Sequence, residues 1–285
     1  ETLRNIARRT WLYFETFVTE QHNFLPPDNF QETPAPVVAP RTSPTNIGLY
    51  FLSVVSARDF GWISLTETIE RLEQTLTSLE KLERYRGHIY NWYDIETLKP
   101  LQPHYISAVD SGNLAGHLLA VASACRHWAD APAAYTQGDF RGILDVLSIL
   151  EDQHAALPDE RRSLRPLRQR MRERLEGMRR SVRTMINEPE TATFRTIDLT
   201  VIAVDIKNLA GGLNEEIRNA DSETIVLWAN KLEKACRSHL ADAQLEGPGT
   251  ASLRSRLLGI GDRARNFAFG MDFSFLLNRE RKLLS

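Results

Sequence analysis

The apolar positions of the chain recur at helical spacing, but they form two different patterns. Residues 64–82 repeat isoleucine or leucine every three or four positions after a Ser-Glu capping box, which predicts an amphipathic helix with one buried face. Residues 43–57 and 110–128 are instead apolar or small on every face. A helix of that kind has no side suited to water, so we expect protein to surround both segments.

This alternation of buried and amphipathic helices predicts two concentric layers. We therefore expect an all-α fold, a partial α/α toroid in which inner helices are wrapped by outer ones. If successive helices run antiparallel, the loops that lead into residues 43 and 110 emerge at the same end of the structure. The second loop contains two short alternating runs within residues 88–109, which predict at most a small β-hairpin.

Two breaker-rich stretches, "ADAPAAY" and "EGPGT", divide the chain. We predict that residues 1–132 form the first part of the toroid, that 133–250 are a helical insertion of three or four long antiparallel helices, and that 251–285 return to the toroid. One insertion helix is rich in arginine, which suits an acidic partner or a nucleic acid. Interspersed Glu173 and Glu176 favour a solvated face, so we predict an insertion without chemistry.

Composition narrows the range of functions. The formal net charge of −2 gives no global reason to expect a nucleic acid or an anionic membrane as partner. Cys125 and Cys236 are far apart in sequence and the histidines lack metal-ligand spacing, so we predict no disulfide framework, no metal and no cofactor. No run of about 18 apolar residues occurs, so no direct membrane insertion is expected. Because the chain lacks an initiator methionine, we interpret it as an excised piece of a longer protein.

Aromatic rings, carboxylates and amides concentrate around "YNWYD", residues 90–94. Flat rings stack on the apolar faces of sugars, while carboxylates, amides and arginine bind the hydroxyl groups. Glycosidic chemistry needs an acid and a second group that attacks or activates water, and Asp94 and Asp110 are weak candidates for these roles. Structural alternatives stay open, because Asp110 can equally cap a helix and Trp92 can pack one face of the hairpin onto the helices.

Five blocks carry a family resemblance: "LPPDNFQE", "RTSPTNIGLY", "ARDFGWI", "RGHIYNWYD" and "VDSGNLAGHLLA". In this order they resemble the glucoamylase-like middle region of bacterial cyclic β-1,2-glucan synthases, and "FAFGMDFSFLLNRERKLLS" resembles a later block of that region. The resemblance implies an α/α toroid on the cytoplasmic face of the inner membrane, as part of a larger membrane protein. It also implies that a β-1,2-glucan chain and the remaining domains of the synthase are the partners, and that the region closes the glucan into a ring by transglycosylation.

The residues that match the family blocks are expected to form a wall of the glucan cleft. They are Asp28, Asn29, Arg41, Asn46, Trp92, Tyr93, Asp94, Asp110 and Asn113. The catalytic glutamates of the family are expected beyond Ser285, so the catalytic residues of this chain are unknown and its own enzymatic activity is left open. The alternative is a non-catalytic helical interaction module or scaffold of a larger membrane enzyme, in which exposed inner faces support self-association.

Overall fold

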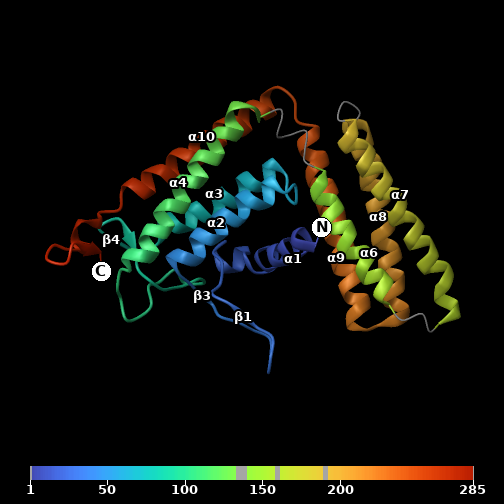
Figure 1. Cartoon of the computed structure of the whole chain (residues 1–285), viewed down its shortest axis with the longest axis horizontal. Coiled ribbons are helices and arrows are strands. Elements are labelled where there is room, and N and C mark those ends of the chain that lie inside the picture. Colours follow the sequence, from blue (N-terminus) through green and yellow to red (C-terminus); the bar gives the residue numbers. More distant parts are fainter. Residues whose placement is uncertain (1, 133–139, 158–160, 189–191, 285) are drawn as a thin grey trace. The chain divides into compact units, whose positions relative to one another are not determined.

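The computed structural model describes residues 2–132, 140–157, 161–188 and 192–284, and helices dominate it (Figure 1). The predicted all-α class is confirmed. The helices are α1 (Thr2–Phe17), α2 (Pro44–Asp59), α3 (Leu65–Lys81), α4 (Ala108–Asp130), α6 (Arg141–Ala156), α7 (Arg165–Asn187), α8 (Ala192–Ile217), α9 (Ala220–Ala243) and α10 (Pro248–Phe269), with 3-10 turns η1 (Glu20–His22), η2 (Arg162–Leu164) and η4 (Phe273–Leu276). None of the helices within the described ranges combines the length and the apolar content needed to cross a bilayer.

Strands occur only as short antiparallel pairs in this part of the chain. They are β1 (Phe30–Gln31) with β2 (Val37–Val38), β3 (Arg41–Thr42) with β6 (Tyr93–Asp94), β4 (Arg84–Tyr85) with β5 (His88–Ile89), and β7 (Leu277–Asn278) with β8 (Leu283–Leu284). The hairpin predicted within residues 88–109 differs from this arrangement, because β5 pairs with the preceding β4. Gly87 turns the chain between them at φ +83°, while Pro100 and Pro103 lack the N–H that a continuing strand would donate.

The described residues divide into two compact units. Unit 1 is built from residues 1–9 and 57–67 together with the described part of 133–247, and unit 2 from residues 10–56, 68–132 and 248–285. Helices α1, α2 and α3 each contribute residues to both units. The predicted start of the insertion at residue 133 lies outside the described residues.

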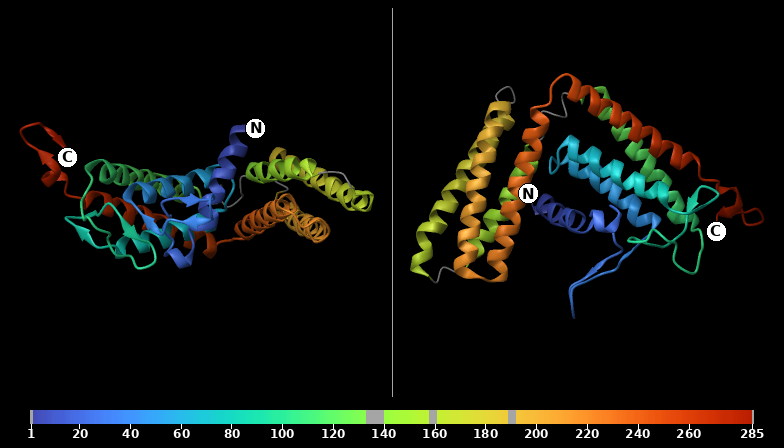
Figure 2. Two further views of the ribbon diagram at one scale, coloured as in Figure 1. Left: turned by 90° about the horizontal axis from the view of Figure 1, so that it is seen from below. Right: turned by 180° about the vertical axis from the view of Figure 1, so that it is seen from behind.

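Four helices of unit 1 form a bundle, in which α6 and α8 each pack against both α7 and α9 (Figures 1 and 2). One side of α7 faces the bundle interior, where Met171, Met178 and Val182 are fully buried. Trp228 and Leu232 of α9 are also buried, with exposed fractions of 1% and 0%. Burying these faces against each other stabilises helices whose outer sides are charged.

Helix α6 holds the turn between α2 and α3 through a buried carboxylate. Asp145 accepts hydrogen bonds from the Trp62 indole Nε1 at 2.8 Å and from Arg4 Nη2 at 2.6 Å. Gly142 lies one turn earlier on α6, where a Cβ atom would stand 2.0 Å from the carbonyl oxygen of Gly61. The turn therefore approaches α6 closely enough to require glycine at position 142.

Helix α9 holds the same turn from another direction. His239 Nε2 lies 2.9 Å from Gly61 O, so this ring nitrogen carries the proton of the hydrogen bond. Asp242 accepts from the backbone N–H of Leu65 at 2.6 Å and from that of Thr66 at 3.3 Å. Since these are the first N–H groups of α3, a residue 177 positions away in sequence caps this helix.

Unit 2 is organised around α4 and α10, which run side by side (Figures 1 and 2). Helix α3 is joined to α10 by two bidentate ion pairs, Arg256 with Glu73 and Arg263 with Glu80, at 2.7–3.0 Å. Because each guanidinium fork meets a carboxylate with two parallel bonds, the pairs fix the register between the helices. The predicted apolar face of α3 is fully buried.

Helices α2 and α4 are apolar as predicted, but protein does not surround them. Leu49 of α2 is 49% exposed, and Val109 and Leu119 of α4 are 72% and 37% exposed. An open apolar face of this kind is compatible with part of a toroid or with an interaction surface.

Candidate functional site

The two loops that lead into α2 and α4 lie together in unit 2, as predicted. Strand β3 precedes α2, and it pairs with β6 in the second loop, so that Arg41 is opposite Asp94 and Thr42 is opposite Tyr93. The backbone N–H of Ile95 adds a bond to Pro40 O at 3.1 Å. This pairing brings side chains of both loops to the N-terminal ends of α2 and α4.

Asp28 is the centre of the first half of the site. Its Oδ2 atom accepts from Arg41 Nη2 at 3.0 Å, from Arg41 Nε at 3.2 Å and from Asn29 Nδ2 at 3.1 Å. Its Oδ1 atom accepts from Asn46 Nδ2 of α2 at 3.2 Å. Four of the residues predicted to contact sugar are thus in one hydrogen-bonded group, at the first turn of α2.

Trp92 extends this group into the second loop. The guanidinium carbon of Arg41 lies 4.6 Å from the centre of the indole ring, which is partly exposed. This distance is typical of a cation–π contact. Arg41 therefore covers one region of the ring that we predicted to face a sugar.

Asp110 belongs to the same network and does not cap α4. Ser107 is the N-cap residue, and its side chain accepts from the backbone N–H of Asp110. The Asp110 carboxylate instead accepts from the Thr45 hydroxyl. With its side-chain oxygen turned toward Trp92 Nε1, Asn91 accepts from that indole at 3.0 Å and donates to Asp110 Oδ2 at 3.1 Å. A chain of contacts thus connects Asp28 to Asp110.

Tyr93 and Asp94 shape the loop. The Tyr93 side chain is fully buried, and its hydroxyl donates to Glu83 O at 2.5 Å and accepts from the backbone N–H of Tyr90 at 2.8 Å. Burial raises the pKa of the Tyr93 hydroxyl. The ring therefore supports the loop from within and offers no open face to a ligand.

The Asp94 carboxylate closes a turn with the residues that follow it. Oδ1 accepts from the backbone N–H of Thr97 at 2.7 Å, the Thr97 hydroxyl at 2.9 Å and the backbone N–H of Glu96 at 3.0 Å. Burial would raise the pKa of this carboxyl, but the hydrogen bonds from Thr97 and Glu96 prevail and lower it. A general acid has to carry a proton at neutral pH, so the lowered pKa makes Asp94 unsuited to that role.

Asn113 is exposed on α4, one turn after Asp110. It lies beside the exposed Val109 and so belongs to the open face of this helix. The structure therefore places Asn113 next to the network without joining the two by a hydrogen bond.

Thr45 and Asn91 are members of the network that were not predicted from the sequence. Asn91 is inside the quoted "YNWYD" stretch, where the alternation of side chains directs it to the opposite side from Tyr90 and Trp92. Thr45 is one residue before Asn46, which was selected. Both signals were present in the sequence, but only a structure shows that the Thr45 hydroxyl and the Asn91 amide meet at Asp110.

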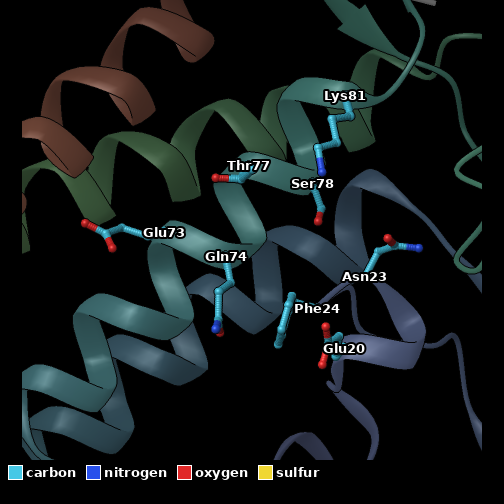
Figure 3. A pocket seen from close by; sticks show the side chains of 8 residues that line it. All are labelled: Glu20, Asn23, Phe24, Glu73, Gln74, Thr77, Ser78 and Lys81. Atoms are coloured by element: carbon cyan, nitrogen blue, oxygen red, sulfur yellow. The ribbon is translucent and has the colours of Figure 1, made fainter.

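A separate shallow pocket of about 360 Å³ lies between α3 and the turn after η1 (Figure 3). Its lining residues are Glu20, Asn23, Phe24, Glu73, Gln74, Thr77, Ser78 and Lys81. Gln74 points from α3 toward Phe24, and both Asn23 and Phe24 have positive φ values, of 50° and 55°. The pocket shares no residue with the network of Asp28 and Asp110.

Among the residues that the structure describes, no three His, Cys, Asp or Glu side chains are grouped so that they could hold an ion. Cys125 and Cys236 are buried and unpaired with each other, and burial raises the pKa of each thiol to about 12. The candidate site therefore offers carboxylates, amides, one guanidinium and an indole, which together suit a neutral ligand rich in hydroxyl groups.

Two comparisons relate the chain to a protein family and to a segment of a longer enzyme. Residues 5–131 match a family described as "Protein of unknown function (DUF3131)". All 285 residues align at 53% identity with a segment of "Cyclic beta-(1,2)-glucan synthase NdvB" of Rhizobium meliloti (strain 1021). The chain spans 10% of the length of this relative.

Proposed function

Because the chain is homologous over its full length to a segment of a cyclic β-1,2-glucan synthase, we propose that unit 2 binds a β-1,2-linked glucan chain. The binding site is the network from Asp28 to Asp110, at the N-terminal ends of α2 and α4. In the complete enzyme it would hold the chain while transglycosylation closes the ring. The groups that break and form the glycosidic bond would come from elsewhere in that enzyme.

One observation carries the proposal. Side chains of two loops that are separated in sequence by α2 and α3 converge on a single partly exposed network, in which Arg41 touches both Asp28 and Trp92. Besides the indole, the network contains two carboxylates, three amides and a guanidinium, and each can exchange its internal hydrogen bonds for bonds to sugar hydroxyls. An open indole face would stack on the apolar face of a glucose unit.

The site residues take different roles in this proposal. Trp92 supplies the ring face, and Asp28, Asn29, Arg41, Asn46, Asp110 and Asn113 contact hydroxyl groups. Tyr93 and Asp94 keep the second loop in shape, because their polar atoms are occupied by that loop and its neighbours.

A second function is favoured by the open apolar faces of α2 and α4. Leu49 and Val109 are largely exposed, which is unusual for helices without a charged face. These faces suit a helical interaction module that associates with itself or with other parts of a synthase. Such a module would need no sugar.

Titration of the chain with linear β-1,2-linked glucooligosaccharides, followed by calorimetry, separates the two functions. We expect binding in the millimolar range or tighter. Trp92→Ala should weaken it by about 1–3 kcal/mol, as when an aromatic ring that stacks on a base is removed. Phe269→Ala is the matched control, since Phe269 is 65% exposed on α10 and outside the network. Absence of sugar binding, together with tight self-association of the chain, would favour the interaction module.

A further inference from the structure

Helix α7 contains more arginines than form ion pairs with the neighbouring helices of its bundle. It carries eight arginines and two glutamates among 23 residues. Arg174 and Arg170 pair with Asp205 of α8 at 2.7 and 3.7 Å, and Arg179 pairs with Glu151 of α6 at 2.5 Å. These arginines are therefore engaged in holding α7 to its neighbours.

Four other arginines form a separate group, the α7 stripe, which consists of Arg165, Arg172, Arg180 and Arg183. All four are exposed, and none forms an ion pair with another residue of the described chain. Spacings of 7 and 11 residues correspond to about two and three turns, so Arg165, Arg172 and Arg183 project along one line of the helix. At a rise of about 1.5 Å per residue this line is about 27 Å long.

The charge of the α7 stripe calls for an anionic partner with repeated acceptors. Guanidinium groups bind phosphate oxygens in a bidentate manner, and they are less strongly hydrated than ammonium groups. The apolar side of α7 is occupied by the bundle core, where Met171 and Met178 are fully buried. The helix can therefore offer charge to a surface without inserting into it.

We propose that the α7 stripe docks unit 1 onto the anionic phosphate surface of a phospholipid bilayer. The line also contains the exposed Glu176, 11 residues after Arg165, so three arginines and one glutamate lie along it. This excess of positive charge on the outer side of a bundle fits a flat surface whose phosphate groups can move to meet it. The net charge of −2 does not oppose this contact, because salt confines electrostatic attraction to about 8–10 Å from each charge.

A nucleic acid fits the same charge less well. Helix α7 packs along its length against α6 and α8, so it cannot enter a major groove of about 12 Å width as a free helix does. Its exposed positions carry Gln169, Glu173 and Glu176 between the arginines and no aromatic ring on which a base could stack.

The test is flotation of the purified chain with vesicles of phosphatidylglycerol and phosphatidylcholine, compared with vesicles of phosphatidylcholine alone. We expect binding only to the first, and weaker binding as salt is raised. The combined change Arg165→Gln, Arg172→Gln and Arg183→Gln should lower the vesicle partition coefficient about a hundredfold, since each arginine near an anionic surface contributes about 1 kcal/mol.

The matched control is Arg254→Gln, Arg279→Gln and Arg281→Gln, which removes the same charge from exposed positions of unit 2. It should leave vesicle binding unchanged, and circular dichroism should show equal helix content in both variants. Equal loss in both variants, or no binding of the unmodified chain to phosphatidylglycerol, would overturn the proposal. Tighter retention on single-stranded DNA than on vesicles, abolished by the stripe variant, would overturn the assignment to lipid. The proposed glucan site lies in unit 2 and is tested by sugar titration, whereas the α7 stripe is tested by vesicle binding. Either proposal can therefore fail while the other holds.

Discussion

Arg41 joins the two loops of the candidate site through one planar group. Its guanidinium binds Asp28 with two nitrogens and lies over the Trp92 ring. A lysine at this position would keep the charge but could not make both contacts with a flat group. Because one side of the indole faces Arg41, a sugar that stacks on Trp92 has to use the remaining side. The arginine thus helps to set the orientation in which a glucan chain could enter.

His154 gives unit 1 a measurable dependence on pH. The side chain is 3% exposed on α6, and burial, together with the nearby charges of Arg168 and Arg172, lowers its pKa from 6.5 to about 4. In the unfolded chain His154 therefore binds a proton below about pH 6.5, whereas in the folded chain it binds a proton only below about pH 4. The stabilising contribution of neutral His154 is complete above pH 6.5 and is lost as the pH falls toward 4, by on the order of 3 kcal/mol.

We expect His154→Gln to reduce this loss of stability on acidification, as measured by urea unfolding at pH 7 and at pH 4.5. The control is His104→Gln, because His104 is exposed and its replacement should leave the pH dependence as it is. Identical pH dependence of the free energy of unfolding in His154→Gln and in the unmodified chain would contradict the assignment.

The residue scale also shows where sequence patterns stop being informative. Alternation in "YNWYD" correctly places Tyr93 and Trp92 on opposite sides of the segment. It cannot tell that Tyr93 is buried and Trp92 is partly exposed. Gly48 and Gly116 look alike in their apolar helices. A Cβ atom on Gly48 would stand 2.3 Å from His117 Nδ1, whereas one on Gly116 would meet nothing within 4 Å. Which side of each helix is covered depends on tertiary packing, which the local sequence does not contain.

At the scale of elements, the helices could be predicted and the connections between them could not. Residues 43–57 and 64–82 differ by only one or two positions at each end from α2 and α3, because caps and apolar spacing are local. Two polar residues, His239 and Asp242, continue the buried stripe of Ile225, Trp228 and Leu232 on α9. Polar groups at core positions indicate buried partners, and this signal could have revealed that α9 holds the turn before α3.

Removal of the cap that α9 provides to α3 is therefore expected to lower the stability of the protein and to expose the first N–H groups of α3. Asp242→Ala should cost about 0.5–2 kcal/mol, the usual range for loss of an N-cap, because the N–H groups of Leu65 and Thr66 lose their acceptor. Hydrogen exchange should accelerate at these two amides in particular. Asp152→Ala is the control, since Asp152 is exposed on α6. Unchanged exchange at Leu65 and Thr66 would show that Asp242 does not act as a cap.

The whole molecule consists of two units that share three helices. Residues 44–56 of α2 belong to unit 2 and residues 57–59 to unit 1, and α1 and α3 are divided in the same way. A helix forms cooperatively, so unfolding of one unit destabilises the part of each shared helix that belongs to the other unit. We therefore expect one cooperative unfolding transition, although each unit has its own core.

Met178→Ala provides the test, because Met178 is fully buried in unit 1 and its truncation should cost about 2–5 kcal/mol. If the units unfold together, native-state hydrogen exchange should show reduced protection in α4 and α10 of unit 2 as well as in α7 and α8 of unit 1. Leu118→Ala, at a fully buried position of α4, is the reciprocal variant and should lower protection in the bundle helices. Loss of protection that stays within the mutated unit in both variants would show that the shared helices do not transmit unfolding. Each unit would then be a separate cooperative structure, and the bundle could be replaced without disturbing the candidate glucan site.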